Sequence, residues 1–304
     1  MQKWCICLAA LIVASIACPV LATPESGEKP RPIIGISIDN GAFAGVEATK
    51  LGVIEQVQLA GGIPVILNDR GDRSAEKDIG EIDGLIVQGD ALDIDPAEYG
   101  QKKHPETKIE TDTTRTKYEN KIIAEALQSK VPVLLICGGM QRANVILGGT
   151  LHQNIPDLHG VKPGHGDNKG NPPDAGSVTA DILPGSQMEK IVGKDALMVN
   201  SFHHQALDKI GNGLRVAATS DVYERPDGKT DLLVEAVDAD PKGKFAGQYI
   251  IGLQFHPELM PNDPISSQVF GSFANAAQKF ATDTGRTHKD EDIIRKVAHK
   301  WTGS

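Results

Sequence analysis

Residues 131–146 read VPVLLICGGMQRANVI and join two patterns in one short stretch. The apolar run that ends at Ile136 is typical of a strand buried on both faces. Cys137, Gly138 and Gly139 follow at once, and the spacing from there to Ile146 is helical. The stretch therefore predicts a strand that turns sharply into a helix at Cys137.

Similar apolar runs alternate with helical stretches elsewhere in the chain. The strand-like runs are IIGISI (33–38), IPVILN (63–68), DGLIVQG (83–89) and YIIGLQFHPE (249–258). We expect Pro257 to halt the last of them, and we expect helices over about 115–128 and 265–280. Continuous Val, Ile and Leu runs separated by helices indicate a mostly parallel sheet covered on both faces, which is the doubly wound α/β class.

The N-terminus looks like a cleavable export signal. One lysine precedes an apolar stretch from Trp4 to Ala17, and Val20-Leu21-Ala22 is a small-residue cleavage pattern. We therefore expect cleavage after Ala22 and a periplasmic or secreted protein, with lipidation of Cys18 as the alternative. No later run approaches the length needed to span a membrane.

Export bears on the cysteines. Of the four in the chain, Cys5, Cys7 and Cys18 lie in the signal or beside its cleavage site, so Cys137 would remain alone. An unpaired thiol is unusual in an oxidising compartment, and it is therefore a candidate nucleophile.

Composition narrows the class of partner. The 304 residues are 40% hydrophobic and 23% charged, as in ordinary globular proteins. The net charge of -9 comes without a long basic stripe, which disfavours nucleic acids and anionic membranes as partners. We expect a small-molecule partner. The organisation we expect is a signal (1–22), a linker (23–32), one domain (33–285) and a charged helical tail (286–304).

A cysteine at a strand-to-helix bend is suited to nucleophilic catalysis. The N-terminus of the following helix stabilises a thiolate through its dipole and free N–H groups. The N–H of Gly138 can point toward an oxyanion on the attacked carbonyl, and Gly89, after a neighbouring strand, is placed to supply a second N–H. The alternative is that Cys137 only fills the core.

The strand-like run 249–258 is expected to supply a base for the thiol of Cys137. His256 lies at its carboxyl end, where doubly wound sheets place their ligand crevice. Residues two apart in an extended chain face the same way, so we expect Glu258 to accept from one ring nitrogen of His256 while the other faces Cys137. The three would form a Cys-His-Glu triad. The alternative for His256 and Glu258 is a surface pair.

These motifs carry a resemblance to a known family. CGGMQRANVILGGTLHQNIPD (137–157) resembles the nucleophile elbow of class I glutamine amidotransferase-like enzymes. GDALDIDPAEYG (89–100), VNSFHHQ (199–205) and LQFHPE (253–258) are similar to segments of the γ-glutamyl-γ-aminobutyrate hydrolase branch. The resemblance covers nearly the whole mature chain. It implies a flavodoxin-like three-layer α/β/α fold and hydrolysis of γ-glutamyl amide bonds through a thioester.

The resemblance also implies roles for residues. Cys137 matches the nucleophile, His256 the base and Glu258 the orienting acid, while Gly89 and Gly138 match the oxyanion donors.

Three further positions, Gln141, Ser201 and His203, match motif positions expected to hold the glutamyl portion of the substrate. The alternative is that VNSFHH is only a structural turn beside the elbow.

Two departures from the branch concern the substrate. The branch usually carries an arginine after its nucleophile, where this chain has Gly138, and a histidine where this chain has Gly176. Both positions are expected near the substrate, so the γ-glutamyl bond would be kept while the leaving amine differs.

The histidines invite a metal interpretation, which we do not favour. His203 and His204 are adjacent, but no third ligand follows at a recognisable spacing, so we expect no metal. The loop 159–176 is rich in Gly and Pro and is a candidate lid. Its His159 and His165 are expected to be solvated.

We therefore expect an exported, cofactor-free cysteine hydrolase of γ-glutamyl amides. One rival is a glutaminase subunit that passes ammonia to a synthase. Another is an inactive relative that only binds γ-glutamyl compounds. The sequence leaves the released amine and the oligomeric state open.

Overall fold

The computed structural model describes most of the expected domain. It covers residues 31–38, 44–67, 74–89, 92–109, 113–162, 165, 176–225 and 227–286. The expected signal, most of the expected linker and the expected tail beyond Arg286 lie outside the described residues, as does most of the loop 159–176.

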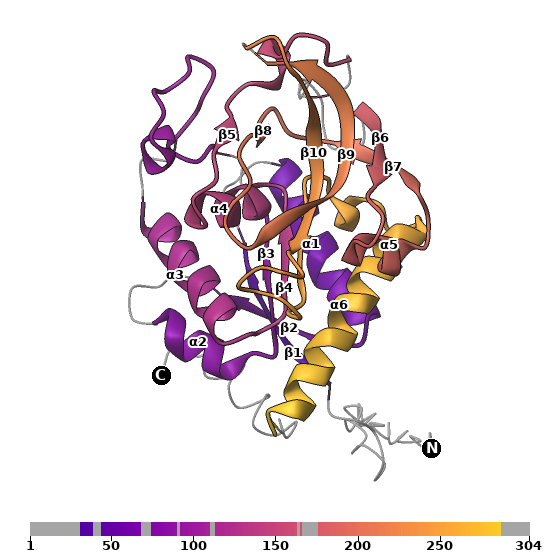
Figure 1. Cartoon of the computed structure of the whole chain (residues 1–304). Coiled ribbons are helices and arrows are strands. Elements are labelled where there is room, and N and C mark those ends of the chain that lie inside the picture. The colour runs from indigo at the N-terminus through magenta and orange to yellow at the C-terminus, as the bar shows by residue number, and fades with distance from the viewer. Residues whose placement is uncertain are drawn as a thin grey trace, which may run out of the picture. The chain divides into compact units, whose positions relative to one another are not determined.

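A nine-stranded sheet forms the middle layer of the structure (Figure 1). Its order is β2-β1-β3-β4-β11-β10-β9-β6-β7. Neighbouring strands from β2 to β11 pair in parallel, and neighbouring strands from β11 to β7 pair antiparallel. The strands are β1 (Ile33–Ser37), β2 (Ile63–Leu67), β3 (Gly84–Val87), β4 (Val133–Ile136), β6 (Gly176–Ile182), β7 (Ala196–Ser201), β9 (Leu214–Glu224), β10 (Thr230–Ala239) and β11 (Ile250–Leu253).

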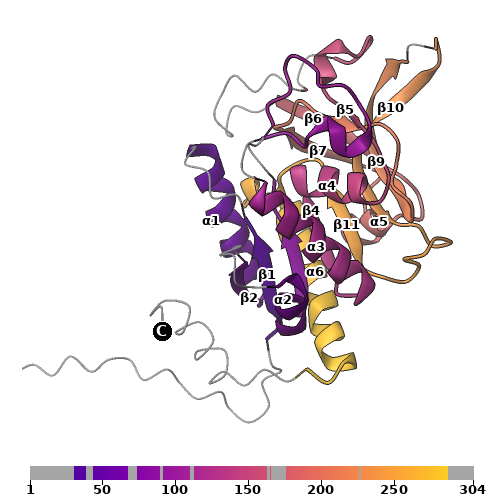
Figure 2. The same cartoon turned by 90° about the vertical axis from the view of Figure 1, so that its left-hand side faces the viewer.

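Helices cover both faces of the parallel half. Figures 1 and 2 show α2, α3 and α4 on one side of the sheet and α1 and α6 on the other. The helices are α1 (Ala44–Leu59), α2 (Ala75–Glu81), α3 (Thr114–Gln128), α4 (Gly138–Ile146), α5 (Gln187–Val192) and α6 (Pro264–Asp283), and the single 3-10 turns are η1 (Pro96–Tyr99), η2 (Ile155–Asp157) and η4 (Pro257–Leu259). A small second sheet pairs β5 (Leu151–His152) with β8 (Ala206–Leu207). The three-layer α/β/α arrangement confirms the predicted fold class.

The sheet separates two hydrophobic cores, one on each of its faces, and the strand geometry explains which residues enter each core. Successive residues of a strand point to opposite faces of the sheet. Leu85 and Val87 of β3 accordingly join the core beneath α2 and α3, while Ile86 between them joins the core beneath α1 and α6. All three are completely buried, so β3 is apolar on both faces, as the sequence predicted.

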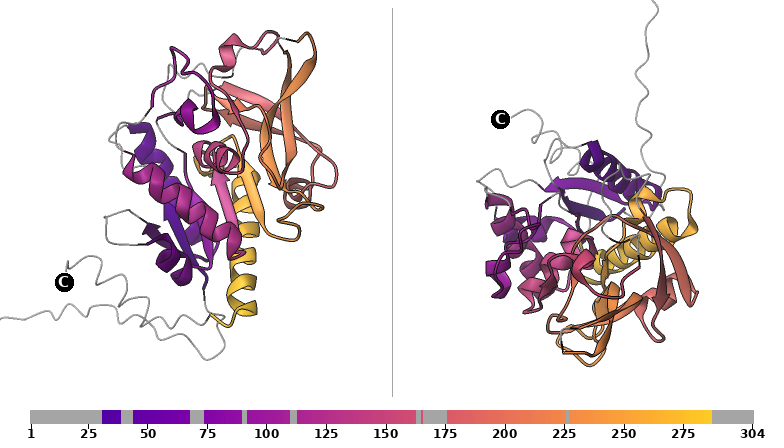
Figure 3. Two further views of the ribbon diagram at one scale, coloured as in Figure 1. Left: turned by 60° about the vertical axis from the view of Figure 1, so that its left-hand side comes forward. Right: turned by 90° about the horizontal axis from the view of Figure 1, so that it is seen from above.

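The antiparallel strands extend the sheet on the side away from β1 and β2, as Figure 3 shows for the orange strands. The chain from β6 to β10 supplies all of them. β10 pairs with β11, and β7 is the last strand on this side of the sheet; both carry side chains of the site described below.

The strand β11 is shorter than predicted. The expected run was 249–258, but the strand ends at Leu253, and Pro257 begins the 3-10 turn η4. Leu253 pairs with Ile136 of β4, so the residues after β11 and Cys137 after β4 leave the sheet at the same edge.

Among the described residues, no helix is both long and apolar enough to cross a membrane.

Candidate active site

Cys137 occupies a sharp bend between β4 and α4. Its φ is +51° and its ψ is -111°, a conformation that residues with side chains rarely adopt and that costs about 1–3 kcal/mol. Its N–H donates to the carbonyl oxygen of Leu253 at 2.7 Å, and its carbonyl accepts from the N–H of Gln141 at 3.1 Å. The strained bend is therefore held from both sides, as expected for a nucleophile elbow.

Gly139 lets the elbow pack directly on the sheet. A Cβ at this position would lie 2.2 Å from the carbonyl oxygen of Val87 and 2.9 Å from its carbonyl carbon. No side chain fits there without moving the backbone. The first turn of α4 thus contacts the end of β3 in a way that only glycine permits.

Gly89 lies against both Cys137 and His256. A Cβ on Gly89 would be 3.2 Å from Cβ of Cys137 and 3.2 Å from Cε1 of His256, and 3.6 Å from the backbone N of Gly138. The two expected oxyanion glycines therefore flank the cysteine. A single added methyl group at position 89 would touch both expected catalytic side chains.

His256 and Glu258 form a buried pair. Nδ1 of His256 lies 2.7 Å from Oε1 of Glu258, and both side chains are almost completely inaccessible to solvent. Burial lowers the pKa of His256, but the negative charges of Glu258 and Cys137 outweigh it and raise that pKa to about 10. Nε2 of His256 has no hydrogen-bond partner within the described part of the chain. With a pKa of about 10 the ring is protonated at neutral pH, and contact with Cys137 contributes to that shift.

The sequence predicted the contact between His256 and Glu258, but alternation along an extended strand is not its cause. The two residues are not on an extended strand. His256 has φ -109° and ψ 88° and precedes the 3-10 turn that contains Glu258. The turn folds the Glu258 side chain back toward the ring, so the pair depends on η4 and not on strand alternation.

Asn200, at the end of β7, holds the backbone of His256. Its Nδ2 donates to the carbonyl oxygen of His256 at 2.8 Å, and its Oδ1 accepts from the N–H of His256 at 2.8 Å. The ring of Phe202 lies edge-on to the ring of His256, with centroids 5.9 Å apart. Sequence reasoning missed Asn200 as a positioning residue, although it lies inside the VNSFHHQ motif.

Gln254 is a second residue that sequence reasoning missed. Its Nε2 lies 3.6 Å from Sγ of Cys137, and its Oε1 accepts from Nε2 of Gln141 at 3.1 Å. Nε2 of Gln141 also donates to the carbonyl oxygen of Gln205 at 3.1 Å. Both N–H groups of Gln141, an expected substrate ligand, are thus engaged within the protein.

Ser201 and His203, the other expected substrate ligands, lie in a buried polar network. Oγ of Ser201 is 3.3 Å from Nε2 of His203 and 3.3 Å from Nδ1 of His165. Nδ1 of His203 donates to the carbonyl oxygen of Gln205 at 2.9 Å, which assigns the proton of the neutral ring to Nδ1. Burial lowers the pKa of His203 to about 3, so the ring is neutral.

One expectation about the histidines was wrong. His165 is not solvated: its side chain is 0% exposed and packs against Ser201, Ser220 and Glu235. His203 does have neighbouring groups able to bind a metal, because His165 and Glu235 approach it from distant parts of the chain. Spacing along the sequence could not show this. His204 instead contacts Asp93 at 2.9 Å, and His159 is exposed as expected.

Comparisons with known proteins identify the family of the chain. The family model described as Peptidase C26 matches residues 32–258. The chain is 30% identical over 270 residues to "Putative glutamine amidotransferase Rv2859c" of Mycobacterium tuberculosis, covering 83% of this chain and 76% of that protein. It is 25% identical over 265 residues to the γ-glutamyl-γ-aminobutyrate hydrolase PuuD of Escherichia coli, covering 84% and 97%. The solved structure of the Trypanosoma brucei CTPS glutaminase domain with bound acivicin is similar in fold, with a TM-score of 0.51, 20% identity and coverage of 82% and 94%.

Proposed function

Because the chain belongs to the Peptidase C26 family, whose members are hydrolases and amidotransferases, we propose that it hydrolyses γ-glutamyl amide bonds through a thioester on Cys137. One observation carries the proposal. A cysteine on a strained strand-to-helix bend adjoins a buried histidine whose far nitrogen contacts a carboxylate. The likeness to PuuD supports the γ-glutamyl part of the proposal.

In the first half-reaction, Sγ of Cys137 attacks the γ-carbonyl carbon of the substrate. The proton of the thiol already lies on Nε2 of His256 before the attack, because the negative charges of Glu258 and Cys137 raise the pKa of this ring to about 10. As the carbon–nitrogen bond breaks, His256 gives that proton to the leaving amine. The products of this step are the free amine and a glutamyl thioester.

In the second half-reaction, water replaces the amine. His256 takes a proton from the water, the resulting hydroxide attacks the thioester carbonyl, and the carbon–sulfur bond breaks. The sulfur leaves as a thiolate and the free acid departs. Glu258 stabilises the imidazolium in both steps, which is consistent with the raised pKa of His256.

The oxyanion of each tetrahedral intermediate needs backbone donors. Gly138 begins α4, and Gly89 packs on Cys137 from the end of β3, so their N–H groups are our candidates. Each such donor typically contributes on the order of 3 kcal/mol to the barrier reduction. Gln254 adds an N–H beside the sulfur.

The released amine belongs to the same proposal. The branch usually carries an arginine where this chain has Gly138, and often a histidine where it has Gly176. Arg142, four residues past Gly138, does not replace the missing arginine, because it is buried and its Nε lies 3.3 Å from Glu119. We therefore expect a leaving amine without the negative charge that an elbow arginine would recognise.

A glutaminase that delivers ammonia is the second candidate. The Mycobacterium tuberculosis relative, which is named as a glutamine amidotransferase, is more similar in sequence than PuuD is, and this favours the second candidate. An amine-releasing hydrolase and a glutaminase use the same nucleophile on the same type of γ-glutamyl amide bond. They differ in the leaving group that they accept, which is a larger amine in the first and ammonia in the second.

Incubation of the purified full chain with a panel of γ-glutamyl amides, glutamine included, tests the proposal. Release of amines other than ammonia supports the hydrolase, turnover of glutamine alone supports the glutaminase, and no turnover contradicts both. Cys137→Ala and His256→Ala should abolish turnover. His159→Ala removes a histidine that is 87% exposed and should leave turnover unchanged.

Mass spectrometry of protein quenched during turnover tests the intermediate. We expect a glutamyl adduct on Cys137, and an adduct on another residue would contradict the assigned nucleophile. Export is a separate part of the proposal, supported by the signal-like first 22 residues. A mature protein that begins at Thr23 in the extracytoplasmic fraction would support it.

A further inference from the structure

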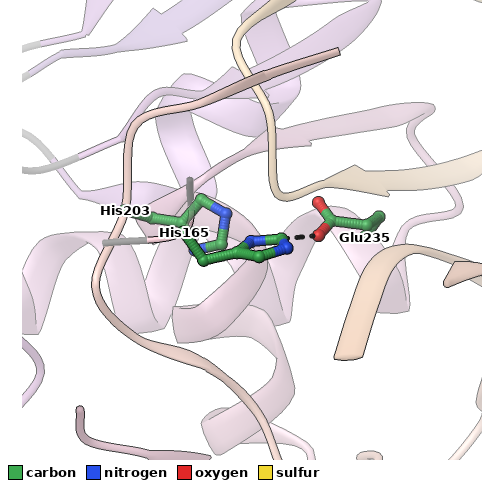
Figure 4. A group of neighbouring side chains, drawn as sticks. All are labelled: His165, His203 and Glu235. Carbon is green, nitrogen blue, oxygen red and sulfur yellow. Dashed lines mark ion pairs between the residues drawn. The ribbon is translucent and has the colours of Figure 1, made fainter. Parts of the chain in front are cut away.

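Three side chains outside the expected triad meet in the interior beside it. His165 comes from the segment before β6, His203 follows β7, and Glu235 lies on β10 (Figure 4). One nitrogen or oxygen atom from each lies within 4.8 Å of those from the other two, and all three residues are buried. The reaction proposed above uses neither His165 nor Glu235.

The cluster contains a buried acid whose ion-pair partner among the described residues is a histidine and not a lysine or an arginine. The Glu235 side chain is 0% exposed, and its Oε2 has no hydrogen-bond partner among the described residues. Oε1 accepts from Ser220 at 2.7 Å and lies 3.8 Å from Nδ1 of His165. A buried carboxylate requires a counter-charge or a proton.

Both histidines are oriented with one nitrogen turned inward. Nδ1 of His203 donates outward to the carbonyl oxygen of Gln205 at 2.9 Å, which leaves the lone pair of Nε2 facing Ser201. Nε2 of His165 lies 3.7 Å from Oδ2 of Asp221, which leaves Nδ1 facing Ser201 and Glu235. His203 shows the pattern of metal-binding histidines, in which one nitrogen binds the ion while the other donates to a carbonyl or carboxylate.

We propose that His165, His203 and Glu235 bind one divalent transition-metal ion, of which Zn²⁺ is the best match. Two imidazoles and one carboxylate are a common donor set for zinc, and a fourth position remains for Ser201 or water. Ligand atoms of a tetrahedral zinc site lie roughly 3.3–3.6 Å apart, as follows from bond lengths of about 2.0–2.2 Å. Small side-chain movements would bring the present atoms to that spacing.

The ion would stabilise the fold beside the nucleophile. It would join the segment that carries His165 to β10, two parts of the chain that are distant in sequence. It would also fix the ring of His203. The carbonyl oxygen of Gln205 accepts from His203 and also from Gln141, and Gln141 in turn donates to Gln254 beside the nucleophile. In this proposal His203 is a metal ligand and not a substrate ligand. The inference does not depend on the γ-glutamyl activity.

Zinc binding by the tag-free full chain tests the proposal. Because the thiols of Cys5, Cys7, Cys18 and Cys137 could themselves capture zinc, the measurement uses a background in which all four cysteines are replaced by Ala. After dialysis against zinc and then metal-free buffer, we expect about one equivalent per chain by mass spectrometry of the metal. We also expect a rise in the melting temperature on zinc addition. Zinc well below one equivalent, or loss of zinc on Cys137→Ala itself, would overturn the proposal.

Variants then locate the ion. Glu235→Gln keeps the shape of the side chain and should weaken zinc binding by about 100-fold or more in competition with a chromophoric chelator. His165→Ala should do the same. His159→Ala, in the same loop but exposed, should bind as the parent does. Equal affinity of the Glu235→Gln variant and the parent would overturn the assignment.

Cobalt substitution covers the case in which these variants fail to fold. Co²⁺ bound by the unaltered cluster should give visible absorption of a tetrahedral nitrogen–oxygen site. It should lack the near-ultraviolet charge-transfer band of a thiolate ligand, even when Cys137 is present. A thiolate band, or no visible absorption at all, would count against the site.

Discussion

Gly139→Ala should disable the elbow, because this position has no room for a methyl group. The added Cβ would lie 2.2 Å from the carbonyl oxygen of Val87, so the two segments must separate by about 0.8 Å to reach even 3.0 Å. Overpacking of this kind typically costs about 1–3 kcal/mol of stability. A displacement approaching 1 Å beside the nucleophile typically lowers turnover on the order of 100-fold.

The matched control is Gly271→Ala. Gly271 lies within α6, and a Cβ there would have no neighbour within 4 Å. Alanine in a helix interior is about 0.5–1 kcal/mol more favourable than glycine, so this variant should be slightly stabilised and fully active.

Urea unfolding followed by circular dichroism measures the stability of both variants. Turnover of the preferred γ-glutamyl substrate, and the rate at which iodoacetamide alkylates Cys137, measure the elbow. If Gly139→Ala matched Gly271→Ala in unfolding midpoint and in both rates, the packing of Gly139 on Val87 would not be what positions the nucleophile.

Three further substitutions test other parts of the site and fold. Glu258→Gln keeps a contact to Nδ1 of His256 but removes the charge that offsets burial, so the pKa of His256 should fall from about 10. NMR titration of labelled histidine measures this pKa, and an unchanged midpoint would contradict the prediction. Because folding raises this pKa above its ordinary value of 6.5, the protonated ring stabilises the folded chain fully below pH 6.5, and this stabilisation is lost as the pH rises toward 10. In urea titrations, the difference in unfolding free energy between wild type and Glu258→Gln should therefore shrink between pH 6.5 and pH 10. Asn200→Ala leaves two buried backbone groups of His256 without partners, which should cost about 2–4 kcal/mol of stability and lower kcat more than it raises KM; a pure KM effect would indicate that Asn200 binds substrate instead. Asp263→Ala removes the side chain that accepts from Ile265 at the start of α6, and should lower stability by about 1 kcal/mol while leaving kcat unchanged.

The expected site shows where sequence reasoning is strong. The short run before Cys137 and the glycines after it predicted a strand-to-helix bend, because buried strands and close packing restrict which residues can occupy them. The pairing of His256 with Glu258 was also predicted, although the turn that produces it was not. Asn200 was not identified, because a single asparagine in a motif does not indicate which backbone it binds.

The sequence by itself determined the parallel α/β core, the position of the bend and the residues able to act as nucleophile and base, since these depend on local pattern and residue chemistry. Only the tertiary structure decided which distant groups meet. Antiparallel strands added beyond β11 place Asn200 against His256 and Glu235 opposite His165. Burial then sets the charge of these groups, and burial is a property of the packed chain and not of any short segment.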